Sequence, residues 1–253
     1  MREGHFCWDD YGTPELKKAR DYYAKIFGWT YNEKPKVEGR AYSVASSHQS
    51  PAVGLFDGKK RHWNSYIAVK DIKKTTKKAQ ELGAQILLEP SAFDGGIMSK
   101  FKDPSGAVVS LWQNDSKNDA QSGEKTKSAK NTEGRVCWRE LVTHDAGKAA
   151  AFYSKLLGWK AETMKQPGMD YTTFSKDGVH VAGMMQLDKN MAKVVPNWLL
   201  YFNVHDLKAA TKKATDAGAK VLMGPQKVEK TGTFSVIQSP NGVSCGILEP
   251  PKP

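Results

Sequence analysis

The chain of 253 residues is poor in cysteine. It has three cysteines, an odd number, and both Cys7 and Cys137 lie beside a tryptophan in an apolar segment. Small disulfide-stapled domains pair their cysteines, so this number does not make a disulfide framework. We therefore interpret Cys7 and Cys137 as reduced core residues rather than as catalytic nucleophiles.

Long apolar runs are also missing. No stretch approaches the ~18–20 apolar residues that a membrane-spanning helix needs, and the N-terminus lacks the apolar region of a secretion signal. We therefore expect a cytoplasmic protein with no membrane partner. The sequence leaves open whether the protein is a monomer or a homodimer.

Histidine is scarce, and its positions show none of the short spacings that metal ligands use. The six histidines are His5, His48, His62, His144, His180 and His205. We therefore expect no histidine metal centre and no bound cofactor.

Acidic residues are outnumbered, 27 against 38 lysines and arginines, which gives a net charge of +11. Many of the lysines lie in residues 73–78, 208–213 and 114–134, where a solvated helix face or a polar segment accounts for them. A nucleic-acid surface would need these clusters on one continuous face, with exposed aromatic residues between them. We therefore do not expect nucleic acid as a partner, whereas anionic ligands stay open.

What the chain does contain is a long repeat. Residues 7–29 return as residues 137–159, and residues 71–90 return as residues 206–225. A period of this length indicates a duplicated domain rather than a solenoid, whose repeats span ~20–50 residues.

Within each half, apolar periodicity predicts a strand, a helix and three strands, and then the same order again. In the first half the strand covers residues 5–11 and the helix 15–27, and the pattern restarts with a strand at 63–69 and a helix at 72–82. A glycine follows each of these helices, as is common at helix C-termini. The chain therefore contains four such modules.

Residues 114–134 separate the two halves. This segment is Ser, Lys, Asn, Asp and Gly with almost nothing apolar, so burial cannot offset the entropy of ordering it. We interpret it as a flexible linker between one domain at residues 1–113 and another at residues 135–250.

Two pairs of motifs mark the halves. The helix signature ARDYYAKIFGW at residues 19–29 matches AAAFYSKLLGW at 149–159, and a turn precedes each final strand, KDPSG at 102–106 and SPNG at 239–242. In these residues the chain resembles the vicinal oxygen chelate superfamily of glyoxalases, bleomycin-resistance proteins and extradiol dioxygenases. It looks closest to the two-domain branch loosely called lactoylglutathione-lyase-related.

The resemblance implies an α+β fold of tandem glyoxalase-like domains. In this superfamily, paired βαβββ modules form curved, mostly antiparallel sheets with the active site on the concave face. In metal-dependent members, His, Glu or Gln ligands lie on the first and last strands of the modules.

Carrying those ligand positions onto this chain gives a set of residues that does not suit a divalent metal. The positions are Trp8, Gly54, Ser65, Ser110, Trp138, Gly183, Leu200 and Gly246. Only the two serines could act as ligands, and they are weak ones. We therefore expect no metal site.

Strand alternation places an aromatic, mostly apolar set of side chains on the face where those ligands would lie. We take as candidate ligand-binding residues Trp8, Phe56, Trp63, Ser110, Trp112, Trp138, Met185, Trp198 and Phe202. Concave sites with few polar groups are typical small-molecule pockets, although aromatic side chains also simply fill a core.

Each half contributes one carboxylate to this face, Asp10 or Glu140, two residues after a tryptophan. A desolvated acid has a raised pKa and suits proton transfer, or it can hold a cationic or hydroxyl-bearing ligand. Alternatively, each acid caps a loop at a strand end or pairs with a lysine or arginine. We take Asp10 and Glu140 as candidate catalytic residues and leave both interpretations open.

Three functions follow from these residues. We favour a metal-independent, small-molecule-binding protein like the bleomycin-resistance members, with aromatic cavities for a small aromatic or cationic molecule. The second is a glyoxalase-like lyase or isomerase, or a dioxygenase-related enzyme, with Asp10 or Glu140 as general base; such catalysis alone contributes only ~10²–10⁴-fold. The third is a scaffold that binds partners through a basic surface.

Overall fold

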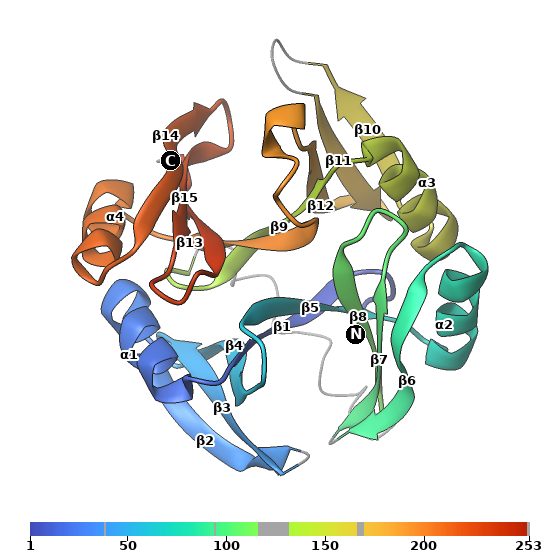
Figure 1. The fold of residues 1–253 in the computed structure, drawn as a ribbon, viewed down its shortest axis with the longest axis horizontal. Helices are drawn as coiled ribbons and strands as arrows, with labels where there is room; N and C mark the ends of the chain where they lie inside the picture. The colour runs from blue at the N-terminus through green and yellow to red at the C-terminus, as the bar shows by residue number, and fades with distance from the viewer. Residues whose placement is uncertain (38, 94, 116–131, 166–169, 252–253) are drawn as a thin grey trace. The chain divides into compact units, whose positions relative to one another are not determined.

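The computed structural model describes residues 1–37, 39–93, 95–115, 132–165 and 170–251 (Figure 1). Most of the segment expected to be a linker, 114–134, lies outside these described residues. The domain boundaries drawn from the sequence therefore stay a prediction.

Within the described residues the chain forms 16 strands and four α-helices. The first half contains β1 (Phe6–Thr13), α1 (Leu16–Phe27), β2 (Thr30–Val37), β3 (Arg40–Ser47), β4 (Ser50–Asp57), β5 (His62–Ala68), α2 (Ile72–Glu81), β6 (Gln85–Phe93), β7 (Gly96–Lys102) and β8 (Val108–Asn114). The second half contains β9 (Val136–Thr143), α3 (Ala146–Leu157), β10 (Lys160–Met164), β11 (Tyr171–Lys176), β12 (Val179–Gln186), a short 3-10 helix (Lys189–Met191), β13 (Asn197–Asn203), α4 (Leu207–Asp216), β14 (Lys220–Val228), β15 (Gly232–Gln238) and β16 (Ser244–Glu249).

The strands form two eight-stranded sheets, one from each half. Their orders are β2-β3-β4-β1-β5-β8-β7-β6 and β10-β11-β12-β9-β13-β16-β15-β14. The first and last strands of each module pair in parallel, and the other pairs within a module are antiparallel. The predicted α+β fold, with four βαβββ modules in curved, mostly antiparallel sheets, is confirmed (Figure 1).

The repeated helix signature shapes α1 and α3 in the same way. Both helices bury an aromatic stripe, which includes Tyr23 on α1 and Tyr153 on α3. Both end at a glycine in the left-handed region, Gly28 at φ 66° and Gly158 at φ 69°. A residue with a side chain would be strained there, which explains the glycine at the end of the motif in both halves.

One compact unit takes in the described residues of Met1–Trp8, Asn64–Glu124 and Trp138–Trp198. Its core combines buried residues of α2 and α3 with strand residues, among them Phe101 and Phe174. This unit therefore contains one module from each half of the chain.

The second compact unit takes in the described residues of Asp9–Trp63, Lys125–Cys137 and Leu199–Pro253. Its core combines buried residues of α1 and α4 with strand residues such as Tyr11 and Ile247. Among the described residues of both units, no helix is long and apolar enough to cross a membrane.

Three aromatic residues assigned to the cavity from sequence lie in these helix-facing cores instead. Trp198 is 4% exposed, and its ring lies 5.1 Å from that of Phe6 and 5.4 Å from that of Tyr153. In the second unit, the rings of Trp63 and Phe202 pack against each other at 5.3 Å.

The alternation predicted for β5 and β13 is therefore wrong by one residue. On β13 every residue from Trp198 to Asn203 is buried, so both faces of the strand are covered and apolar character does not distinguish them. The pattern on β5 is similar, since its last five residues are all buried. Strands buried on both faces read as continuous apolar runs, and their side-chain direction cannot be taken from hydrophobicity.

The start of α4 offers a local test of the fold. The Asp206 carboxylate accepts a hydrogen bond from the backbone N–H of Ala209 at 2.8 Å and so caps the helix. Replacing Asp206 with alanine is expected to lower the free energy of unfolding by about 1 kcal/mol, measured by urea denaturation. Asp216→Ala removes only an exposed ion pair with Lys212 and should change it by less than about 0.5 kcal/mol. Equal effects of the two substitutions would contradict the capping role.

Candidate functional site

Asp10 lies on the concave face of β1, opposite Gly54 of the parallel strand β4. Its side chain is buried, at 6% exposure, and one carboxylate oxygen accepts a hydrogen bond of 2.9 Å from the Tyr42 hydroxyl. A Cβ at position 54 would overlap both the carboxylate and the hydroxyl, and would lie 2.6 Å from Cζ of Tyr42. Gly54 therefore makes room for this acid–tyrosine pair.

The second half repeats the arrangement. Glu140, at 7% exposure, lies opposite Gly183, and the Tyr171 hydroxyl hydrogen-bonds the Glu140 carboxylate. The same hydroxyl accepts a hydrogen bond of 3.0 Å from the indole N–H of Trp138. Burial, and after it the negative charge of Glu140, raises the pKa of Tyr171 well above its ordinary value. The phenol therefore stays protonated and available as a donor.

We call these two arrangements the acid–tyrosine pairs: Asp10–Tyr42 and Glu140–Tyr171. Both acids were found from the sequence, whereas both tyrosines were missed. A signal was available, because each tyrosine lies 12 residues before the glycine that faces its acid, Gly54 or Gly183. The alternation of residues on β3 and β11 does not distinguish the tyrosines from their neighbours. The equal spacing in the two halves does distinguish them.

Four other residues assigned to the cavity share a strand face with these pairs. Trp8 lies two residues before Asp10 on β1, and Phe56 lies two residues after Gly54 on β4, so each side chain points to the same face as the pair. Both are half-buried. In the second half, Trp138 lies two residues before Glu140 on β9, and Met185 lies two residues after Gly183 on β12. Both are also half-buried. The strands that carry the acid–tyrosine pairs therefore present apolar, partly accessible side chains on the same face.

Ser110 and Trp112 of β8 lie on the concave face of the first sheet. The Ser110 hydroxyl is fully buried and donates to the amide oxygen of Asn64 at 3.0 Å. The Trp112 indole donates to Asn114 at 2.7 Å, and its ring meets that of Tyr66 edge-on at 6.3 Å. Among the described residues, the buried amide nitrogen of Asn64 has no hydrogen-bond acceptor. Asn64 is therefore a candidate ligand donor that the sequence pattern did not indicate.

The three cysteine thiols are either hydrogen-bonded to backbone carbonyls or buried. The thiols of Cys7 and Cys137 donate to the backbone carbonyls of Tyr66 and Tyr201 at 3.4 and 3.3 Å. Burial raises the pKa of the Cys245 thiol to about 12, which keeps it protonated at neutral pH.

The metal-ligand positions of the superfamily do not fit a divalent metal in this chain. Asp10 and Tyr42 fill the space beside Gly54, and Tyr171 and Trp138 fill the space beside Gly183. A Cβ at Gly246 would overlap the ring of Tyr201. Ser110 is already engaged with Asn64. In the part of the chain that the structure describes, no group of three or more His, Cys, Asp or Glu side chains could hold a metal ion.

A match to a protein-family model shows which family this chain belongs to. The model of the glyoxalase/bleomycin resistance protein/dioxygenase superfamily matches residues 4–111 and, a second time, residues 135–246. The chain belongs to this superfamily. The resemblance inferred from the helix signatures and closing turns, and the tandem glyoxalase-like arrangement, are thereby confirmed.

Proteins of related sequence align with this chain over nearly its whole length. It is 31% identical over 261 residues to "Putative glyoxylase CFP32" of Mycobacterium tuberculosis, an alignment that covers 98% of this chain and 96% of the relative. It is 28% identical over 262 residues to "Anthracycline biosynthesis protein DauV" of a Streptomyces species, covering 96% of this chain and 92% of the relative.

Solved structures share the fold at low sequence identity. A Mn(II)-bound glyoxalase from Novosphingobium aromaticivorans has a TM-score of 0.67 and 13% identity, with 99% of this chain and 83% of that chain covered. An extradiol ring-cleaving dioxygenase from B. fuscum has a TM-score of 0.66 and 16% identity, with 96% and 71% covered.

Proposed function

We propose that this superfamily member binds small molecules without a metal, at the acid–tyrosine pairs. The observation that supports this proposal most strongly is the repetition of the pair in both halves, each time over a glycine at a ligand position of the metal-dependent relatives. A buried polar pair within an apolar surround is a common form of small-molecule site. A divalent metal would need several donors that these positions lack.

The pair suggests the class of ligand. A carboxylate oxygen accepts hydrogen bonds from hydroxyl or ammonium groups, whereas the Tyr171 and Trp138 rings offer flat apolar contact. A flat molecule with hydroxyl or cationic substituents meets both requirements. Two relatives are named for anthracycline biosynthesis, so an anthracycline is the first probe to test.

The proposal is tested by titrating the protein with an anthracycline and with a panel of hydroxylated aromatic compounds, followed by tryptophan fluorescence. Tyr171→Phe is expected to weaken binding about 2- to 12-fold and Glu140→Gln about 10-fold or more, because the second removes a charged hydrogen-bond partner. Tyr31→Phe is the matched control, since the Tyr31 hydroxyl donates to the backbone of Arg20 on the helix-facing side. Equal effects of Tyr31→Phe and Tyr171→Phe would contradict the site.

Metal content is measured on the same preparation by elemental analysis. A stoichiometric transition metal that supports binding would overturn the metal-independent part of the proposal and leave the location of the site untouched.

A second candidate, a metal-independent lyase or isomerase, rests on the buried carboxylate of Glu140. As a general base, this carboxylate would accept a proton from a carbon acid. Glu140→Gln would then keep ligand binding but lose turnover by ~10²–10⁴-fold. Unchanged turnover in an active preparation would rule out this base.

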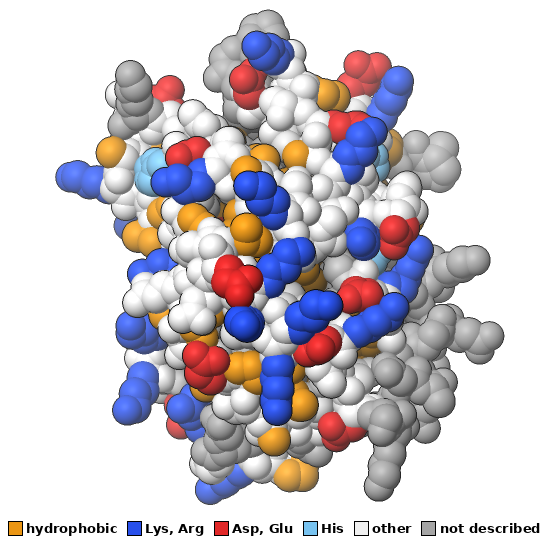
Figure 2. Space-filling view, turned by 90° about the vertical axis from the view of Figure 1, so that its right-hand side faces the viewer, with side chains coloured by type: hydrophobic (Ala, Val, Ile, Leu, Met, Phe, Trp, Pro, Cys, Tyr) orange, Lys and Arg blue, Asp and Glu red, His pale blue; other side chains and the backbone are white. Residues whose placement is uncertain are grey.

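The scaffold hypothesis gains no specific support. On the face that Figure 2 shows, acidic side chains are interspersed among the more numerous basic ones, and the basic side chains do not gather in one patch. Partner binding through a basic surface, like the expected absence of a nucleic-acid partner, stays a prediction.

A further inference from the structure

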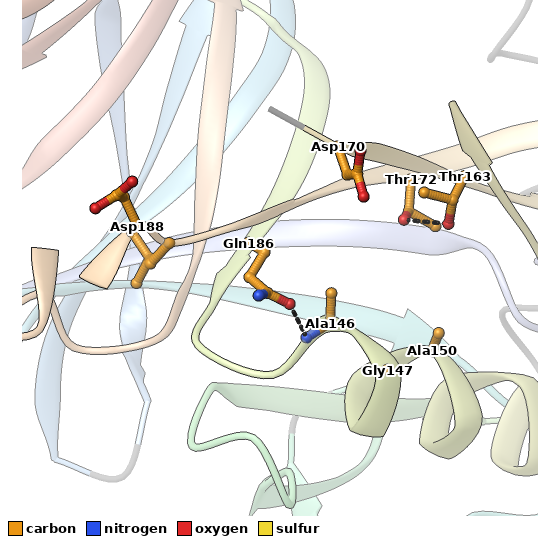
Figure 3. A pocket seen from close by; sticks show the side chains of 9 residues that line it. Ala146, Gly147, Ala150, Thr163, Asp170, Thr172, Gln186 and Asp188 are labelled. Atoms are coloured by element: carbon orange, nitrogen blue, oxygen red, sulfur yellow. Dashed lines mark hydrogen bonds between the residues drawn. The ribbon is translucent and has the colours of Figure 1, made fainter. Parts of the chain in front are cut away.

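A cavity lies away from the acid–tyrosine pairs, on the helix-facing side of the sheet of the second half. Its volume is about 340 Å³, and it opens between the first turns of α3 and the strands β10, β11 and β12 (Figure 3). The residues that line it are Ala146, Gly147, Ala150, Thr163, Asp170, Thr172, Gln186, Leu187 and Asp188. We call it the α3 pocket.

The first half shows what can fill this place. The strand pair Glu33–Ser43 has the same register as Thr163–Thr172, and Arg20 of α1 occupies the helix position of Ala150. The three residues that form the equivalent wall in the first half are therefore Arg20, Glu33 and Ser43.

In the first half that wall is closed by the arginine side chain. The Arg20 guanidinium donates to Ser43 Oγ at 3.1 Å and to Glu33 Oε2 at 3.0 Å, and it lies 5.6 Å from the ring centre of Tyr31. The side chain is only 20% exposed, so it fills the space between helix and sheet. A guanidinium that donates to a hydroxyl and a carboxylate is well satisfied in such a place.

The second half has no side chain that fills this space, but polar groups still line it. Ala150 has no side chain beyond Cβ, and small residues also replace Tyr31 and Glu33, namely Ala161 and Thr163. Thr172 keeps the hydroxyl of Ser43, and it lies 2.8 Å from the hydroxyl of Thr163 on the floor of the pocket. Thr172 is buried at 4% exposure, as a structural floor residue would be.

The pocket also carries negative charge. Asp170 contributes a carboxylate near the two threonines, as Figure 3 shows, whereas the Asp188 carboxylate lies beyond Gln186 and accepts from the backbone N–H of Asn190 at 2.8 Å; none of the nine lining residues is basic. The amide oxygen of Gln186 accepts from the backbone N–H of Ala146 at 3.2 Å, which covers the start of the helix with an acceptor rather than leaving donors for an anion. The charge and the acceptors therefore favour a cation.

We propose that the α3 pocket binds a small molecule through an alkylguanidinium group, which takes the place that Arg20 fills in the first half. The planar group would donate to the threonine hydroxyls and pair with the carboxylate of Asp170. This site is separate from the acid–tyrosine pairs and does not depend on the function proposed for them.

The test uses n-butylguanidinium as the probe and two-dimensional NMR of the full chain as the readout. The wild-type protein is expected to show saturable shifts of the amide signals of Ala150 and Thr172. Ala150→Arg should weaken binding roughly tenfold or more, because the new side chain fills the pocket as Arg20 does. Asp170→Asn should weaken it about two- to fivefold.

A matched control separates occupation of the pocket from a change in net charge. Ala151→Arg adds the same charge to the exposed neighbouring position on α3 and should leave binding unchanged. Equal losses in Ala150→Arg and Ala151→Arg, or no saturable shift in the wild-type protein, would overturn the proposal. Equal binding of n-butanol would show an apolar cavity and would also overturn it, whereas weaker binding of n-butylammonium would support recognition of the planar group.

Discussion

Replacing Trp198 with alanine is expected to lower the free energy of unfolding by about 3–5 kcal/mol, because the substitution empties the centre of a packed core. Three aromatic rings surround Trp198, with centroids 5.1 Å away for Phe6, 5.4 Å for Tyr153 and 6.2 Å for Trp159. Its indole N–H also donates to the Tyr153 hydroxyl at 3.1 Å, which in turn donates to Asp103 at 2.7 Å. Urea unfolding followed by circular dichroism measures the loss.

Trp112→Ala is the matched control for this prediction. Trp112 is half-buried on the opposite, concave side of its sheet, where fewer contacts disappear on truncation. It should therefore cost clearly less stability than Trp198→Ala. If Trp198→Ala left stability within about 1 kcal/mol of the wild type and weakened ligand binding instead, Trp198 would be a pocket wall, as its sequence pattern first suggested.

The order of elements could be predicted from sequence because local signals and the repeat agree. The glycines after α1 and α3 have φ values of 66° and 69°, a conformation that favours glycine, so the chain marks its own helix ends. Each signal also occurs twice, and a chance pattern in one half would not return in the other. The closing turn at residues 102–106 is fixed in the same way, by Asp103 accepting from the backbone of Ser105 and Ala107.

The sheet face to which each strand side chain points could not be predicted equally well. On β1 and β9 the candidates Asp10 and Glu140 were found because each acid follows a tryptophan by two residues, although a second charged residue, Asp9 or Arg139, stands beside it on the strand. On β13 no polar residue lies between Trp198 and Phe202 except the amphipathic Tyr201, so hydrophobicity does not separate the faces. Which side faces the helices is decided by packing with α3 at Trp198 and with α1 and α4 at Phe202, and that information is not local.

The α3 pocket illustrates a different limit. It arises from the absence of side chains, since alanines stand where the first half has Arg20 and Tyr31. A missing side chain leaves no pattern in a single sequence, and another residue could have filled the space. Only the register pairs Glu33–Ser43 and Thr163–Thr172 show that the two places correspond.

Replacing Gly183 with alanine is expected to disrupt the Glu140–Tyr171 pair and to lower the free energy of unfolding by about 1–3 kcal/mol, the usual range for an overpacked site. The added Cβ would overlap the Tyr171 hydroxyl, and it would lie 2.7 Å from Cζ of Tyr171 and 2.8 Å from the indole nitrogen of Trp138. The tyrosine ring would have to move, so any ligand bound through Glu140 and Tyr171 would be lost with it. Chemical denaturation and the ligand titration above measure the two effects.

Gly147→Ala provides the control within the same half. A Cβ at this position, in the first turn of α3, meets nothing closer than 3.7 Å, so alanine should raise stability by up to about 1 kcal/mol through a higher helix propensity. The clash at Gly183 is tested further by combining Gly183→Ala with Tyr171→Phe, which removes the atom that the new Cβ overlaps. Because Cζ remains too close, the double variant should recover part of the lost stability, with a coupling of about 0.5–3 kcal/mol. Strictly additive effects, or a Gly183→Ala protein as stable as the wild type, would mean that Gly183 does not hold the place of the acid–tyrosine pair.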